Sequence, residues 1–254
     1  RQLLDKVSSA LRSRPKDGAK PVAQPPKASS APAPRANLHP PARANLREQT
    51  PQQEKPPTRD ADHGGLQLVL IGVSTGGPRT LEDILPKLPS SLPCAIVVAQ
   101  HMPAHFTDAF AKRMDRLCAM RVREVNTTIP LEQGNIYIGQ GGTDVTVQER
   151  LGRLVVAPRP EAPEHAWHPS VDVLVHSAMK VLRPQQITGV QLTGMGCDGA
   201  QEMAKLKQQG GRTIAESEAS CVVFGMPQEL ITRGGATVVL HASEVAQRLC
   251  AWLA

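Results

Sequence analysis

The pattern of apolar positions divides most of the chain into short runs and longer periodic stretches. The short runs are rich in β-branched residues and predict buried strands at 66–71, 95–99, 187–192, 213–215 and 237–240. Apolar residues with helical spacing lie between most of these runs, at 78–88, 106–117, 170–182, 199–209 and 243–253. Strands that alternate with helices predict an α/β fold, with a doubly wound, mostly parallel sheet that carries helices on both faces.

One region departs from this alternation. Three short apolar segments, at 136–138, 144–148 and 154–157, follow one another without a helix between them. They are separated by the glycine-containing stretch 139–142 and by Leu151-Gly152, both of which are typical of turns. This spacing predicts a small antiparallel β-hairpin unit inserted on the main sheet.

The first 64 residues have a different character from the rest. Apolar side chains at positions 3, 4, 7 and 11 fall on one face of a helix over 1–14, which we expect to be the last helix of a preceding domain. Residues 15–64 are rich in Pro, Ala and Lys and contain too few apolar residues to form a core, so they predict a disordered linker. We therefore expect one folded domain over 65–254. Because the chain begins with Arg1, it is expected to be part of a longer product.

The net positive charge is concentrated at the N-terminus. The chain has 29 Lys and Arg against 23 Asp and Glu, and residues 1–60 hold 12 of the basic and 5 of the acidic side chains. Residues 61–254 are therefore close to neutral, which argues against a nucleic-acid-binding face on the folded part.

Cysteine usage and hydropathy predict a cytoplasmic protein. The five cysteines are odd in number and scattered, without a C-x-x-C pair, which indicates reduced thiols rather than disulfides or a zinc site. No stretch of about 18 apolar residues is present, and the first residues lack a signal-peptide pattern. We therefore expect no membrane insertion.

Candidate chemistry begins at the end of the first predicted strand. The segment Gly72-Val73-Ser74-Thr75-Gly76 predicts a tight turn into a helix with Pro78 in its first turn. A serine at such a turn is exposed as a nucleophile, although G-x-S-x-G also occurs by chance and a plain glycine-rich turn, or one that holds a phosphate, is the alternative.

Two further strand ends carry residues that complete this chemistry. His101 follows the second predicted strand, and Asp198 lies in the glycine-rich stretch 193–199 after the strand at 187–192. Ligands of such sheets bind beyond the carboxyl ends of the strands, so we expect Ser74, His101 and Asp198 to meet there. The histidine would take the serine proton, and the aspartate would bind the other ring nitrogen and fix its tautomer.

Backbone N–H groups near these strand ends are candidates for an oxyanion hole. The glycine-rich stretch 193–199 can turn its N–H groups toward a substrate oxygen, and so can the turn that carries the serine. We choose the N–H groups of Thr75 and Met195 for this role.

Each choice has an alternative. His101 is also compatible with a turn, and Asp198 with a cap of the helix that starts near Gly199. A rival base is His241, which follows the strand at 237–240 and would give the chain order Ser74, Asp198, His241 of α/β-hydrolases.

Metal and cofactor sites are not expected. His101 and His105, and likewise His165 and His168, are spaced closely enough for a metal, but no Asp, Glu or Cys frame accompanies either pair. The first turn also lacks the G-x-G-x-x-G pattern of dinucleotide binding.

Five motifs in this order resemble the catalytic domain of the chemotaxis protein-glutamate methylesterase family, CheB: GVSTGGP, QHMP, HPSVDVL, LTGMGCDGA and ASCVVFGMP. The resemblance runs from about Leu66 to the C-terminus. It implies a doubly wound parallel sheet with an antiparallel hairpin, and a triad of Ser74, His101 and Asp198, which decides against His241. The segment 148–165 fits the family least well.

The resemblance also implies a function. Such enzymes hydrolyse glutamate methyl esters on the cytoplasmic helices of chemoreceptors, release methanol, and also deamidate glutamines. A receiver domain, of which 1–14 would be the last helix, would link this domain to a chemotaxis histidine kinase. We expect a monomer. Two other functions stay open: a general esterase that uses His241, and a non-catalytic receptor-binding module.

Overall fold

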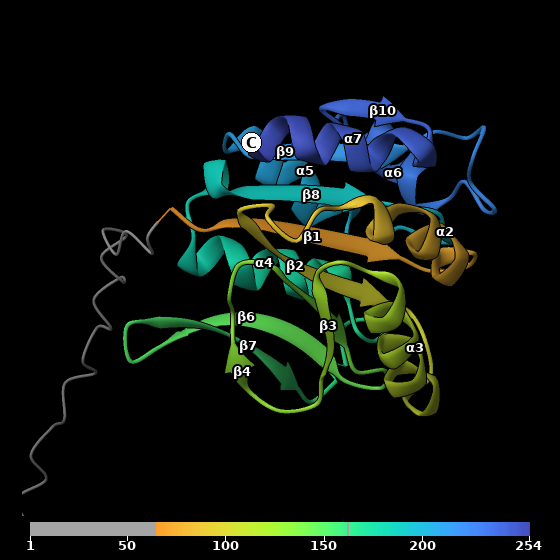
Figure 1. Ribbon diagram of the computed structural model, residues 1–254. Helices are drawn as coiled ribbons and strands as arrows, with labels where there is room; N and C mark the ends of the chain where they lie inside the picture. The colour runs from red at the N-terminus through yellow and green to blue at the C-terminus, as the bar shows by residue number, and fades with distance from the viewer. Residues whose placement is uncertain (1–64, 162) are drawn as a thin grey trace, which may run out of the picture. The chain divides into compact units, whose positions relative to one another are not determined.

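A seven-stranded sheet, in which every neighbouring pair of strands is parallel, forms the centre of the fold (Figure 1). In spatial order its strands are β10 (Val238–Leu240), β9 (Arg212–Glu216), β8 (Ile187–Gln191), β1 (Gln67–Val73), β2 (Cys94–Gln100), β5 (Asn135–Gly139) and β3 (Arg121–Val125). The mostly parallel sheet predicted from the sequence is confirmed. The first strand of the domain, β1, lies between β8 and β2.

The computed structural model describes residues 65–161 and 163–254. The predicted helix over 1–14 and the predicted linker over 15–64 lie outside the described residues. None of the helices in the described part is long and apolar enough to cross a membrane.

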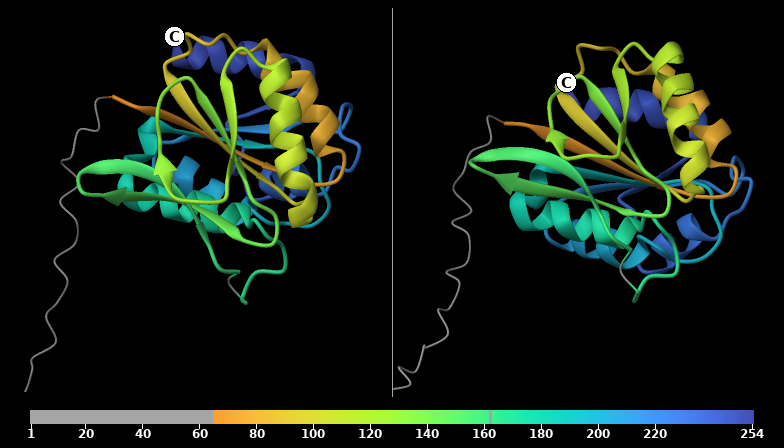
Figure 2. Two further views of the ribbon diagram at one scale, coloured as in Figure 1. Left: turned by 60° about the horizontal axis from the view of Figure 1, so that its bottom comes forward. Right: turned by 90° about the horizontal axis from the view of Figure 1, so that it is seen from below.

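Helices cover both faces of the sheet (Figure 2). One face carries α2 (Gly77–Ile84), α3 (Ala104–Leu117) and α7 (Ala242–Leu253), and the other carries α4 (Val171–Val181), α5 (Ala200–Gln208) and α6 (Met226–Thr232). Consecutive side chains of β1 alternate between the two cores: Leu68 and Leu70 belong to the core under α4, and Val69 and Ile71 to the core under α2. Since both faces are buried, the strand is apolar throughout after Gln67.

A smaller antiparallel sheet packs beside α4. It consists of β4 (Ile129–Pro130), β7 (Arg153–Arg159) and β6 (Asp144–Arg150), in that order. Leu151 and Gly152 both have positive φ, 51° and 73°, which is the backbone of a two-residue hairpin turn between β6 and β7. The predicted hairpin is confirmed for these two strands.

The prediction was wrong for residues 136–138, which belong to the main sheet. They form β5, which pairs in parallel with both β2 and β3. Their side chains are fully buried, and the Tyr137 hydroxyl donates to the Pro130 carbonyl at 2.8 Å. A three-residue apolar run fits either sheet, so only long-range pairing decides between them.

Several elements were not predicted. The edge strand β3 has charged residues at three of its five positions, and α6 is only seven residues long, so both give weak signals. The predicted helix at 78–88 is divided into α2 and the 3₁₀ helix η1 (Leu85–Lys87), and a second 3₁₀ helix, η2 (Pro184–Gln186), precedes β8.

The carboxyl ends of β1, β2 and β8 lie next to one another at one edge of the sheet (Figure 1). Backbone hydrogen bonds continue the pairing into the segments that follow: His101 N donates to the Val73 carbonyl at 3.0 Å, and Ser74 N donates to the Thr193 carbonyl at 2.9 Å. The three segments that carry the predicted site residues are thereby held in register.

We expect a chain shortened to residues 65–254 to fold. In the described part of the chain, both hydrophobic cores are built from side chains between Leu66 and Leu253. Burial of this apolar surface drives folding. Urea denaturation of the shortened and the full chain should give superimposable transitions with the same midpoint. A lower midpoint or a broadened transition for the shortened chain would show that residues 1–64 contribute to the folded state.

Candidate active site

Ser74 lies in a tight turn between β1 and α2. Gly76 caps α2 with φ 86°, in the left-handed region that costs glycine nothing, and Pro78 occupies the first helical turn. The Ser74 carbonyl accepts hydrogen bonds from Gly77 N at 2.9 Å and from Gln100 Nε2 at 3.0 Å. The turn is thus fixed on both sides of the serine, whose half-buried side chain lines a cavity.

His101, at the end of β2, pairs with Asp198, in the loop between β8 and α5. His101 Nε2 lies 2.8 Å from Asp198 Oδ2, and the two side chains are only 5% and 9% exposed. His101 Nδ1 is buried and has no hydrogen-bond partner among the described residues. A proton on Nε2, directed at the carboxylate, leaves the lone pair of Nδ1 available to accept a proton.

The Asp198 carboxylate lies at the N-terminus of α4, where it accepts four hydrogen bonds. Oδ2 accepts from the His101 ring and from Val171 N at 2.7 Å, and Oδ1 accepts from Ser170 Oγ at 2.9 Å and from Asp172 N at 3.1 Å. Burial acts to raise the pKa of Asp198, but the hydrogen bonds from the imidazole and the two amides outweigh it and lower the pKa. The helix dipole favours the same charged form.

Ser74 and His101 line one cavity of about 550 Å³. The β1–β2 register pairs Val73 with Gln100, so the next residues along the two strands are Ser74 and His101. No hydrogen bond joins the Ser74 hydroxyl to His101 in the described residues, and such bonds often tighten only when substrate is bound. Asp198 lies behind His101, outside the cavity lining.

The two candidate oxyanion donors reach the same cavity. Thr75 and Met195 both line it, and in the part of the chain that the structure describes neither N–H donates to a backbone carbonyl. Thr193 Oγ1 donates to the Thr75 carbonyl at 2.9 Å and ties the two loops together. Both N–H groups are therefore free of the backbone ladder, as an oxyanion hole requires, and their residues line the same cavity as Ser74.

Gly194 allows these two loops to approach closely. A Cβ at this position would lie 2.7 Å from Ser74 Cβ, and it would also overlap Met226 Sδ. The loop after β8 can reach the serine only with glycine here.

His241, the rival base, lies elsewhere. It follows β10, three strands away from β1, a distance of about 14 Å at the usual strand spacing. It caps α7, where its Nδ1 accepts from Ser243 N at 3.3 Å, and it is not part of the cavity lining. The structure therefore does not bring His241 to Ser74.

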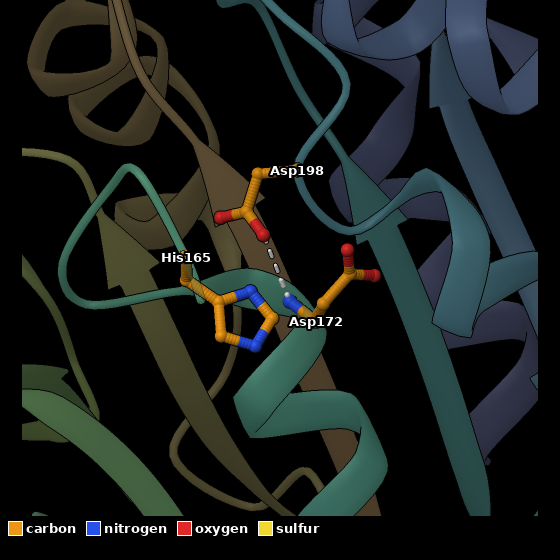
Figure 3. Close-up of side chains that lie close together, drawn as sticks. All are labelled: His165, Asp172 and Asp198. Atoms are coloured by element: carbon orange, nitrogen blue, oxygen red, sulfur yellow. Dashed lines mark hydrogen bonds between the residues drawn. The ribbon is translucent and has the colours of Figure 1, made fainter. Parts of the chain in front are cut away.

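Three potential metal ligands, one of which is Asp198, lie close together (Figure 3). Ligand atoms of His165, Asp172 and Asp198 lie within 4.8 Å of one another. However, Asp198 already accepts four hydrogen bonds, one of them from Asp172 N, and the positive end of α4 disfavours a cation there. These residues do not fit a metal, because binding one would cost Asp198 its bonds. His105 lies apart, exposed on α3 against Phe106.

Comparison with known proteins identifies the family. The model of the CheB methylesterase family matches residues 69–249. The chain belongs to the CheB methylesterase family. It is 55% identical over 186 residues to a protein of Rhodospirillum rubrum named protein-glutamate methylesterase/protein-glutamine glutaminase 3, which covers 73% of this chain and 50% of that protein. A similarly named protein of Carboxydothermus hydrogenoformans is 45% identical over 201 residues, covering 78% and 57%.

A solved CheB structure has the same fold. The crystal structure of the Thermotoga maritima CheB methylesterase catalytic domain matches with a TM-score of 0.70 and 36% identity, over 73% of this chain and 97% of that one. The chain spans about half the length of the curated relatives it matches. The resemblance inferred from the five motifs is confirmed.

Two buried glutamines at this CheB site were not predicted from the sequence. Gln100, the last residue of β2, donates from Nε2 to the carbonyls of Ser74 and His101, both at 3.0 Å. Gln191, the last residue of β8, donates from Nε2 to the Asp198 carbonyl at 3.0 Å. A polar residue that ends an apolar strand is the only sequence signal of this role.

A second histidine–aspartate pair was also missed. His168 Nδ1 lies 2.9 Å from Oδ1 of the fully buried Asp144, which also accepts from Ser170 N at 2.8 Å. Burial acts to lower the pKa of His168, but the hydrogen bond to Asp144 and the nearby negative charge raise it overall. The pair joins β6 to the segment before α4, and His168 lines the cavity.

Replacing His168 should cost more stability at low pH than at high pH. A raised pKa in the folded state means that the pairing stabilises fully below the unfolded value and that this gain is lost as pH rises through the folded value. In urea unfolding, His168→Gln should lower the free energy of unfolding by about 1–3 kcal/mol at about pH 5.5 and by less at about pH 8.5. The exposed His105→Gln is the control. An equal loss for His168→Gln at both pH values would contradict the charged pair.

Adding a methyl group at Gly194 should destabilise the fold. We expect Gly194→Ala to lower the free energy of unfolding by about 1–3 kcal/mol, because its Cβ meets the fixed backbone turn of Ser74. Gly189→Ala in β8 is the matched control, since its Cβ would lie 3.3 Å from the flexible Met203 side chain. Equal stabilities of the two variants would show that the loops have room at Gly194.

Proposed function

We propose that residues 65–254 form the catalytic domain of a serine hydrolase that demethylates glutamate methyl esters on the cytoplasmic helices of chemoreceptors and also deamidates glutamines. The observation that carries this proposal is the pairing of His101 with Asp198, at 2.8 Å, where His101 lines the same cavity as Ser74. The names of the CheB relatives support the substrate class, because they include protein-glutamate methylesterase and protein-glutamine glutaminase.

In the first half of the proposed reaction Ser74 Oγ attacks the ester carbonyl carbon while His101 Nδ1 takes its proton. The negative charge that develops on the carbonyl oxygen is stabilised by the N–H groups of Thr75 and Met195. Asp198 stabilises the imidazolium through Nε2 without taking the proton itself. His101 then returns the proton to the methoxy oxygen, the carbon–oxygen bond breaks, and methanol leaves an acyl group on Ser74.

In the second half a water molecule attacks the acyl carbon, and His101 Nδ1 takes a proton from it. The same N–H groups stabilise the second oxyanion. When this intermediate collapses, His101 protonates Ser74 Oγ, and the product is a glutamate side chain. For a glutamine substrate His101 instead returns the proton to the amide nitrogen, the carbon–nitrogen bond breaks, and ammonia leaves.

The geometry does not favour the two other functions considered. A general esterase that uses His241 would need that residue near Ser74, but His241 instead caps α7. A purely receptor-binding module would have no need of a buried base with an unpaired nitrogen beside a serine. The expected partners, chemoreceptors and a histidine kinase acting through a preceding receiver domain, rest on the family resemblance.

Methanol release from a chemoreceptor fragment that bears radiolabelled glutamate methyl esters tests the proposal. Ser74→Ala and His101→Ala should each lower kcat on the order of 10⁴-fold or more, because members of a triad act as a unit. His241→Ala is the matched control and should keep the rate of the unaltered chain. Loss of activity in His241→Ala alone would favour the α/β-hydrolase arrangement, and no release by the unaltered chain would favour the binding module.

A further inference from the structure

An indole ring lies against the His101 ring. The ring centroids of Trp167 and His101 are 5.7 Å apart, and the planes are inclined by only 13°, which is a stacked arrangement. Trp167 is 46% exposed, whereas the His101 side chain is 5% exposed. Both residues line the cavity that contains Ser74. A large exposed aromatic side chain beside the buried base requires an explanation, because exposure of an indole is unfavourable.

The backbone around Trp167 is anchored by its neighbours. The next residue, His168, binds the fully buried Asp144, and Ser170 N donates to the same carboxylate. Ser170 Oγ also donates to Asp198 Oδ1 at 2.9 Å. The segment that presents the indole is therefore fixed to β6 on one side and to the partner of His101 on the other.

We infer that Trp167 is a positioning residue for His101. By stacking, the indole holds the imidazole in the orientation that directs Nε2 at Asp198, and it stabilises the imidazole when that ring is protonated. An indole face within about 6 Å of a cation attracts it, and tryptophan is the best aromatic partner for this contact. While it holds the serine proton His101 is a cation, so the attraction is then stronger than for the neutral ring. The kinetic consequence rests on the proposed function, whereas the stack itself does not.

Other charged groups face the same imidazole. Asp198 binds its Nε2, Glu161 and His168 line the cavity, and His165 lies beside Asp198. Because two of these groups are histidines, an effect on Trp167 must be assigned to His101 with variants of the individual histidines.

The kinetic test compares Trp167→Ala with Trp167→Phe. Trp167→Ala should lower kcat for methanol release about 5- to 30-fold and leave KM within about twofold, since the stack acts on the base. Trp167→Phe keeps an aromatic face and should retain most of kcat. Trp252→Phe, a change of the chain's other tryptophan on α7, is the control and should leave both constants unchanged. A raised KM with unchanged kcat in Trp167→Ala would overturn the inference and make Trp167 a substrate contact.

A second test needs no enzyme activity. In Trp252→Phe, Trp167 is the only tryptophan, so the emission reports on this indole alone. His101→Gln in that background should change the intensity or the wavelength of the emission, because it removes the ring that stacks on the indole. His168→Gln, a change of the neighbouring residue, should leave the emission as it is.

The outcomes of the two tests are separable. Emission that His101→Gln leaves unchanged would overturn the stack. Emission that depends on His101, in a protein that releases no methanol, would support the stack and contradict the proposed reaction. Emission that depends on His101 together with an unchanged kcat in Trp167→Ala would overturn the positioning role.

Discussion

The bond network of the Asp198 carboxylate is the constraint on which the site depends. Asp198 leaves the sheet after β8, yet its two oxygens bind the first amides of α4 and the imidazole at the end of β2. One buried charge therefore joins the loop after β8 to α4 and to β2, which is far from both in the sequence. Its desolvation is offset because all of the bonds come from fixed donors, two of them backbone groups of a helix that is already formed. The carboxylate that orients His101, the proposed base, thus also binds the first amides of α4.

The sequence was sufficient to predict the strand ends and the residues that occupy them. Ser74, His101 and Asp198 each follow an apolar run, and parallel strands end at a common edge, so local patterns imply a common location. The glycines near these strand ends also indicate tight turns. The backbone needs glycine at Gly76 because of its positive φ, and at Gly194 because two loops approach closely there. The doubly wound fold followed from the same alternation of strands and helices.

The contacts that refine the site could not be predicted, because they join residues with no common periodicity. His168 and Asp144 lie 24 positions apart, and neither belongs to a motif that indicates pairing. The stack of Trp167 on His101 depends on how the segment before α4 is folded, and that segment contains neither a strand nor a helix. Similarly, β5 is too short for its apolar run to distinguish the parallel sheet from the antiparallel one. In each case the deciding information is a long-range contact.

The roles proposed for the two ring nitrogens of His101 agree with the strand pairing in the sheet. Nε2, the nitrogen farther from the backbone, reaches the carboxylate at the end of α4, which leaves Nδ1, the nearer one, without a partner. A base that works through Nδ1 accepts its proton close to its own main chain, so its nucleophile must come from the adjacent strand. The parallel register of β1 and β2 meets this condition, because Ser74 and His101 follow the paired residues Val73 and Gln100. The β1–β2 pairing thus places the proposed nucleophile next to the proposed base, while Asp198 orients the imidazole ring.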